Sequence, residues 1–229
     1  MIDIHNHILP QVDDGARDLE ESLAMAKMAE KDGIRHIIAT PHLLDPGISR
    51  EAIADKTAAL NEALRAGGLS VRVHPGAEIP IHLLDMPRWR IGLAASRFLL
   101  VEFPPDTILP GAAELFRGLI RQGHKIIIAH PERNLAAMQK PERLLDLLEP
   151  GVSVQITAGS LTGDMGKTAQ SLARHLLSLQ QVAYIASDAH NAHTRPPVLS
   201  KALAAAARWL KQPADRLATE NPRQILDAA

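Results

Sequence analysis

Short apolar runs alternate with longer amphipathic segments along the whole chain. The apolar runs are rich in isoleucine, valine and leucine, which predicts strands buried on both faces. At the start, Ile2 and Ile4 alternate with Asp3 and His5, so the chain is expected to open with a strand. The further predicted strands are Ile34 to Thr40, Leu69 to His74, Arg97 to Phe103, Lys125 to Ala129, Val152 to Thr157 and Val182 to Ser187.

The amphipathic segments predict helices between these strands. Asp18 as N-cap and Glu21 as the far residue of a capping box predict that the first helix runs from Leu19 to Asp32. The residues from 79 to 96 follow no clear period and receive no assignment. The other predicted helices run from about Ser49 to Gly67, Gly111 to Gln122, Gly166 to Gln180 and Pro197 to Pro213, with shorter ones at Leu135 to Gln139, Glu142 to Leu148 and Arg223 to Asp227.

This alternation predicts a parallel sheet, because parallel neighbours need crossover connections. Such a sheet is either open, with its functional groups at one switch point, or closed into a barrel. Polar candidates follow six of the seven predicted strands, and only a closed ring brings so many strand ends to one mouth. We therefore predict an α/β barrel of about seven strands, a shortened relative of the eight-stranded barrel. The candidates are His5, His7, His42, Glu78, Glu102, His130, Asp188 and His190.

Composition narrows the classes of protein that fit. The 229 residues are 46% hydrophobic and 22% charged, enough for one domain over residues 1–229. A formal net charge of -1 without a basic run argues against a nucleic-acid partner. No apolar run approaches membrane-spanning length, and Met1 leads directly into a strand, so we expect a cytoplasmic protein without membrane insertion. The absence of cysteine excludes disulfides, thiolate metal sites and a cysteine nucleophile.

The first fifteen residues carry the densest candidate chemistry. His5 and His7 stand at i and i+2, which points both imidazoles to one side of an extended backbone. The turn Asp13-Asp14-Gly15 can return a carboxylate toward them, and either aspartate can serve. Histidines and carboxylates without sulfur suit manganese, iron or zinc, of which we favour manganese. Because a lone His-x-His pair is also typical of an ordinary edge strand, the prediction depends on the rest of the chain.

Short motifs carry these candidates in a fixed order: HNH at 5–7, DDG at 13–15, TPH at 40–42, GAE at 76–78, VEF at 101–103, AHPER at 129–133 and SDAHN at 187–191. The order resembles the polymerase and histidinol phosphatase (PHP) superfamily. Within it, the chain is most similar to the bacterial metal-dependent protein tyrosine phosphatases that accompany tyrosine autokinases in capsule and exopolysaccharide synthesis. The resemblance extends to NPRQIL at 221–226 and implies the PHP fold, a distorted (β/α)7 TIM-like barrel.

The resemblance also implies a site with three divalent metal ions. Its register favours Asp14 over Asp13 as a ligand. Arg133 and Arg195 match the family's phosphate-binding arginines, although Arg133 could simply pair with Glu132 and Arg195 could brace its loop. The implied ligands are His5, His7 and Asp188 for one metal, Glu102 and His130 for a second, and Asp14, His42 and His190 for a third, with Glu78 bridging the first two.

These groups predict a phosphoric monoester hydrolase. Clustered metals lower the pKa of a bridging water so that hydroxide attacks phosphorus in line, and arginine forks hold the phosphoryl oxygens. By resemblance the substrate is phosphotyrosine on a partner tyrosine autokinase. One departure is Asn134, where the family commonly has an aromatic residue after the HPER arginine. With aromatic residues at 3%, the substrate preference is left open.

Three other functions fit parts of this pattern. A small-molecule phosphatase such as histidinol-phosphate phosphatase would share the metal site but need a deeper pocket. An amidohydrolase would favour a carboxylated lysine where this chain has Glu102, and a metal-stabilised binding module would need fewer ligands. The remaining histidines lie outside the strand-end pattern and are expected to be surface or packing residues: His36, His74, His82, His124, His175 and His193.

Overall fold

The strands form a closed ring of parallel neighbours. The structure, a computed structural model, describes residues 1–43 and 48–229. One sheet has the order β1-β2-β3 and the other β4-β5-β6-β7-β8, with parallel pairing throughout. A bridge between Asn6 of β1 and Ala189, which follows β8, and a bridge between His42, which follows β2, and Glu78 of β4 join the two sheets into the ring. The strands are β1 (Ile2–Asn6), β2 (His36–Ala39), β3 (Arg72–His74), β4 (Glu78–Pro80), β5 (Phe98–Glu102), β6 (Lys125–Ala129), β7 (Val152–Thr157) and β8 (Val182–Ala186).

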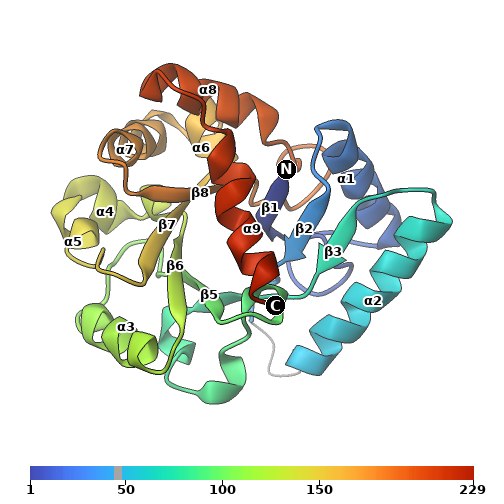
Figure 1. The fold of residues 1–229 in the computed structure, drawn as a ribbon, viewed down its shortest axis with the longest axis horizontal. Coiled ribbons are helices and arrows are strands. Elements are labelled where there is room, and N and C mark those ends of the chain that lie inside the picture. The colour runs from blue at the N-terminus through green and yellow to red at the C-terminus, as the bar shows by residue number, and fades with distance from the viewer. Residues whose placement is uncertain (44–47) are drawn as a thin grey trace.

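Helices surround this ring (Figure 1). The side chain of Asp18 accepts a hydrogen bond from the Glu21 amide, and that of Ser49 accepts one from the Ala52 amide, which confirms the two predicted helix starts. The helices are α1 (Leu19–Lys31), α2 (Arg50–Ala66), α3 (Ala112–Arg121), α4 (Leu135–Gln139), α5 (Glu142–Leu145), α6 (Ala158–Thr162), α7 (Lys167–Ser178), α8 (Ser200–Leu210) and α9 (Glu220–Asp227). The predicted barrel of alternating strands and helices is confirmed.

Within the described residues, the structure has one strand more than the seven predicted, because β4 follows β3 after a short break. Pro75 cannot donate a ladder hydrogen bond, and a Cβ on Gly76 would lie 2.9 Å from Ile38 Cγ2. The chain therefore breaks after β3 and resumes as β4, in the stretch that the sequence pattern left largely unassigned. That stretch also holds three 3₁₀ turns, η1 (Ile81–Leu83), η2 (Pro87–Trp89) and η3 (Leu93–Ala95). Glu78 consequently begins a strand rather than following one.

The last long helix also begins later than predicted, at Ser200 rather than Pro197. Its first amides are satisfied from a distant helix end, because Asp32 Oδ2 accepts from the amides of Leu199 at 2.7 Å and Ser200 at 3.0 Å. A remote carboxylate thus replaces a local cap.

Apolar packing closes the end of the ring where the strands begin. A cluster of buried residues that includes Leu100, Ile127 and Tyr184 packs against Ile225 of α9, which crosses the front of the ring in Figure 1. A second and larger cluster fills the space between strands and helices. The carboxyl ends of the strands are left for polar side chains, as in other β/α barrels. Within the described residues, none of the helices is both long and apolar enough to cross a membrane.

Candidate metal centre

All nine predicted metal ligands lie at the mouth formed by the carboxyl ends of the strands. His5 lies in β1, Glu102 ends β5, and His130 follows β6 directly. One extra residue in β1 between Asp3 and Asn6 shifts its register against β2, the kind of bulge that often lies beside a functional site. The nine fall into overlapping groups whose candidate ligand atoms lie within 4.8 Å of one another: His5, His7 and Asp188; His7, Asp14, His42 and His190; His5, Glu78 and His130; and His42, Glu78 and Glu102.

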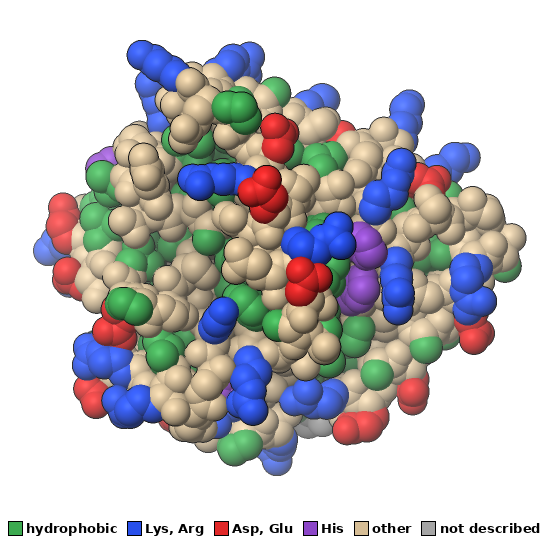
Figure 2. All heavy atoms as spheres, viewed as in Figure 1, with side chains coloured by type: hydrophobic (Ala, Val, Ile, Leu, Met, Phe, Trp, Pro, Cys, Tyr) green, Lys and Arg blue, Asp and Glu red, His purple; other side chains and the backbone are tan. Residues whose placement is uncertain are grey.

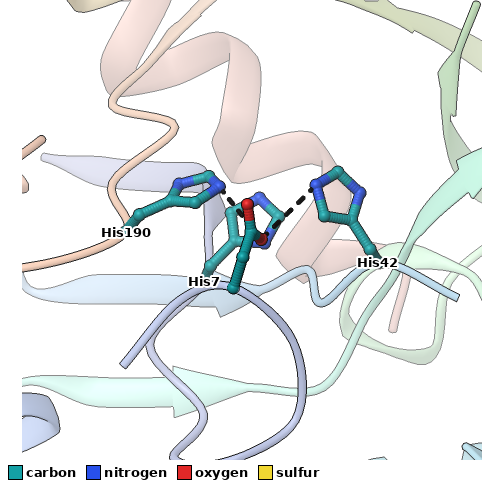
Figure 3. Close-up of side chains that lie close together, drawn as sticks. His7, His42 and His190 are labelled. Carbon is teal, nitrogen blue, oxygen red and sulfur yellow. Dashed lines mark ion pairs between the residues drawn. The ribbon is translucent and has the colours of Figure 1, made fainter. Parts of the chain in front are cut away.

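The group around Asp14 resembles the third predicted ligand set. Asp14 Oδ1 lies 3.4 Å from His190 Nε2 and 3.8 Å from His42 Nε2. Figure 3 shows the rings of His7, His42 and His190 turned toward one carboxylate, and the His7 and His190 ring centroids are 3.9 Å apart. The structure thus brings Asp14 together with His42 and His190, and its role as a metal ligand stays a prediction.

Asp13, the competing candidate, has a different position that the sequence did not reveal. Its Oδ2 lies 2.6 Å from His7 Nδ1 and accepts the His42 amide at 2.9 Å, while Oδ1 accepts the Gly15 amide at 3.0 Å. A carboxylate on Nδ1 holds the proton there and leaves Nε2 with a lone pair for a metal. Asp13 therefore orients His7 from behind.

Gln155 holds His5 in the same way. Its Oε1 lies 2.9 Å from His5 Nδ1, and the side chain is fully buried in the middle of β7. A lone amide inside the apolar run Val152–Thr157 was the available sequence signal. With both Nδ1 atoms donating, the Nε2 atoms of His5 and His7 face each other at 3.2 Å, and Glu78 Oε2 lies 3.2 Å from that of His5. Lone pairs and a carboxylate oxygen that converge at such distances fit a cation between them.

The electrostatics of the cluster also fit a bound cation. Within the described part of the chain, Glu78 Oε2 and His42 Nδ1 are buried 3.1 Å apart, and neither has a partner with hydrogen-bond geometry. Burial opposes ionisation, yet His5 and His130 hold the pKa of Glu78 well below its usual range. Burial is likewise outweighed at His7, where Asp13 and Glu78 raise the pKa to about 10. Protons on such histidines balance the carboxylates in the metal-free protein, and divalent cations bound at the same nitrogens would displace these protons.

Two of the predicted ligands have left-handed backbones. His130 has φ 30° and Asp188 has φ 53°, a region that residues other than glycine seldom adopt. Pro131 follows His130 and disfavours a right-handed helical conformation there. Strained conformations of this kind concentrate at functional sites.

The two predicted phosphate-binding arginines converge on one atom. Arg133 Nη1 donates a hydrogen bond to Asp188 Oδ2 at 2.5 Å, and Arg195 Nη2 forms an ion pair with the same oxygen at 2.7 Å. The other oxygen, Asp188 Oδ1, lies 3.5 Å from His5 Nε2 and 3.6 Å from His7 Nε2. Burial raises the pKa of the Asp188 carboxyl, but the positive charges of His5, His130 and Arg195 outweigh it and lower that pKa. One buried carboxylate therefore separates the histidine cluster from two guanidinium groups.

The side chain of Asn134 has a structural role, because its hydrogen bonds all go to nearby backbone groups. Its Nδ2 donates to the carbonyls of Pro104 at 2.7 Å and Thr107 at 3.0 Å, and its Oδ1 accepts the Ala137 amide at the start of α4. Beside it lies a cavity of about 90 Å³ that reaches two predicted ligands, and its walls are formed mainly by Phe103, Pro105 and Pro131 with Glu102, His130 and Arg133.

The histidines left outside the strand-end pattern belong to none of the candidate metal groups among the described residues. His36 Nδ1 and His74 Nε2 form a pair at 3.0 Å on β2 and β3. Figure 2 shows histidine side chains at the surface among arginine and lysine side chains, in the region where Figure 1 shows these strands. These two histidines are a separate feature of the fold.

A parallel β/α barrel with imidazoles and carboxylates gathered at its mouth has the architecture of the metal-dependent barrel hydrolases. Dihydropyrimidinase from Brevibacillus agri shares this fold, with a TM-score of 0.56 at 12% identity over 98% of this chain and 70% of the other. At that identity the likeness concerns the fold alone.

The chain belongs to the CpsB/CapC family of capsular polysaccharide synthesis, whose pattern matches residues 1–227. It is 38% identical over 232 residues to tyrosine-protein phosphatase YwqE of Bacillus subtilis, covering 99% of this chain and 91% of that protein. The fold also matches a chain from the crystal structures of YwqE from Bacillus subtilis and CpsB from Streptococcus pneumoniae, described as unique metal-dependent tyrosine phosphatases. The TM-score is 0.94 at 36% identity, and the match covers 100% of this chain and 95% of the other. The family predicted from the motif order is confirmed.

Proposed function

We propose that this protein is a metal-dependent protein tyrosine phosphatase. The observation that supports it most is the position of Asp188, whose two oxygens face a histidine cluster on one side and two arginines on the other. This combination suits a phosphoric monoester, because cations and guanidinium groups together neutralise its oxygens during in-line attack.

The nine predicted ligands would hold three divalent ions, for which we propose manganese. Such ions would act as Lewis acids and would lower the pKa of bound water, so that a hydroxide nucleophile is available near neutral pH. Asp13 and Gln155 keep His7 and His5 in the metal-binding tautomer. Arg133 and Arg195 bind the phosphoryl oxygens, and Arg195 Nε, buried without a partner among the described residues, offers one more donor.

The open cavity beside Arg133, of about 90 Å³, is the proposed position of the phosphate-bearing edge of the leaving tyrosyl ring, with the rest of the ring in the barrel mouth. Phe103, Pro105 and Pro131 give it apolar walls, and Glu102 and His130 connect it to the metal centre. Asn134 contributes by holding the 104–107 loop that forms part of this wall. An aromatic residue at position 134 is therefore not required for an aryl subsite.

We further propose that the substrate is a phosphotyrosine segment of a partner tyrosine autokinase in capsule or exopolysaccharide regulation, in the cytoplasm. The test is to measure kcat/KM on a phosphotyrosine peptide, a phosphoserine peptide and histidinol phosphate with one manganese-loaded preparation. A phenolate, with a conjugate acid of pKa about 10, leaves without protonation more readily than an alkoxide, so the phosphotyrosine peptide should be fastest. Histidinol phosphate faster by about tenfold would replace the proposal with a small-molecule phosphatase.

A further inference from the structure

A second cavity borders the site at Arg195. Its volume is about 120 Å³, and none of the nine predicted metal ligands lines it. Its apolar surface comes from Ala158, Met165, Pro196 and Val198, and the hydroxyl side chains of Thr162, Ser187 and Thr194 line the rest with Gly159. Exposed Lys201 and Asp164 also border it. The composition is typical of a subsite that takes an apolar group and leaves charged groups at its edge.

One wall of this cavity is fixed by a buried carboxyl. Glu132 is fully buried, and its Oε1 accepts hydrogen bonds from the Thr157 amide at 2.9 Å and the Ser160 hydroxyl at 2.7 Å. These bonds hold α6 against the turn that carries Arg133. The wall therefore keeps a defined distance from the phosphate-binding arginine next to Glu132.

The opposite wall is fixed by a turn. Asn191 Oδ1 accepts the amides of His193 at 2.9 Å, Thr194 at 2.7 Å and Arg195 at 3.2 Å. Pro196 and Pro197 then restrict the chain up to α8. A cavity between two constrained walls is formed before its occupant arrives, which reduces the entropic cost of binding.

The two cavities flank the proposed phosphoryl position. Arg133 borders the cavity with Phe103, Arg195 borders this one, and both arginines meet at Asp188 Oδ2. If the tyrosyl ring enters the first cavity by its phosphate-bearing edge, the peptide backbone lies above the mouth. In an extended peptide the side chains at i and i±2 point the same way, about 6.6 Å apart at about 3.3 Å per residue.

We propose that the cavity beside Arg195 binds an aliphatic side chain two residues from the phosphotyrosine of a peptide substrate. This inference rests on the proposed phosphatase function and adds a sequence preference to it. A cavity of about 150 Å³ accepts benzene in an unrelated engineered protein, so about 120 Å³ suits a valine or leucine side chain. The rim charges remain in water while the apolar walls are covered.

The test compares phosphotyrosine peptides with leucine or glycine two residues before or after the phosphotyrosine. The wild-type, manganese-loaded protein should prefer leucine by about tenfold in kcat/KM at one of these positions. Thr162→Trp and Val198→Trp fill the cavity from opposite walls and should reduce that preference to about twofold or less. Thr162 is exposed, so its replacement leaves the core intact. Thr168→Trp, on the exposed side of α7, is the matched control and should keep the preference.

The possible outcomes distinguish a failure of the proposed subsite from a failure of the proposed phosphatase function. A wild-type protein that hydrolyses phosphotyrosine peptides without preferring leucine at either position overturns the subsite and leaves the phosphatase function standing. A preference that persists in both filled variants assigns it to another surface and also overturns the subsite. A metal-loaded wild-type protein that hydrolyses neither these peptides nor p-nitrophenyl phosphate overturns the phosphatase function itself.

Discussion

Asp13 Oδ2 lies 2.6 Å from His7 Nδ1. The next residue, Asp14, faces the histidines from the other side, with its Oδ1 3.4 Å from His190 Nε2. The adjacent carboxylates of Asp13 and Asp14 thus take different positions, one behind an imidazole and one in front of it. A carboxylate behind a ligating imidazole increases its basicity and fixes its orientation.

Asp13→Asn should weaken manganese binding about 10- to 100-fold while the fold persists. The amide keeps the shape of the side chain but loses the charge that holds the proton on His7 Nδ1. The measurement is a competition titration of the metal-free protein against a chelating dye. Asp55→Asn, an exposed position on α2, is the control, and equal affinities in the two variants would remove Asp13 from the site.

Arg195→Lys should lower kcat/KM for a phosphotyrosine peptide about 10- to 100-fold, because lysine keeps the charge but not the fork. Arg133→Lys should have a similar effect. Since both arginines form ion pairs with Asp188 Oδ2, the double variant should lose less transition-state stabilisation than the sum of the two single losses. Arg208→Lys, exposed on α8, should match the wild type. Strict additivity would show that the two arginines act independently.

The residues at the mouth of the barrel could be predicted because each one's place depends only on its position relative to its own strand. Each parallel strand brings the residue after it to the same end of the ring, so His42, His130 and Asp188 were visible from their positions in the chain. The motif order added the register that separates Asp14 from Asp13. Both conclusions needed no knowledge of side-chain packing.

The remainder depends on contacts between distant residues. Gln155 is 150 residues from His5 in the chain, and only the closed ring places its amide on the imidazole. Asp32 satisfies the first amides of α8 in the same non-local way, which is why the predicted helix start at Pro197 was wrong. The break between β3 and β4 follows from the close approach of Gly76 to Ile38, which no periodicity records.

Removing the metal should abolish activity and lower thermal stability. After chelation, hydrolysis of p-nitrophenyl phosphate should fall more than about 100-fold and return with manganese. Manganese at about 100 times its Kd should stabilise the fold by about 2.7 kcal/mol, which corresponds to a rise in Tm of about 5–10 °C. Full activity in a sample verified as metal-free would contradict the mechanism. Cysteine alkylation should have no effect, because the chain has no cysteine.

The His36–His74 pair predicts how stability changes in acid. Burial, His36 and Arg72 lower the pKa of His74 to about 4, whereas in the unfolded chain it lies near 6.5. Below pH 6.5 the unfolded chain binds a proton that the folded protein accepts only near pH 4. The stabilising contribution of neutral His74 is therefore complete above pH 6.5 and is lost as the pH falls toward 4.

His74→Gln should flatten this part of the stability profile. Glutamine can still hydrogen-bond to His36 but does not titrate, so the free energy of unfolding should fall less between pH 7 and pH 4.5 than in the wild type. Urea denaturation across that range measures both curves. His82→Gln, an exposed position in η1, should follow the wild-type curve. If His74→Gln follows it too, neutral His74 contributes nothing to the acid sensitivity of the fold.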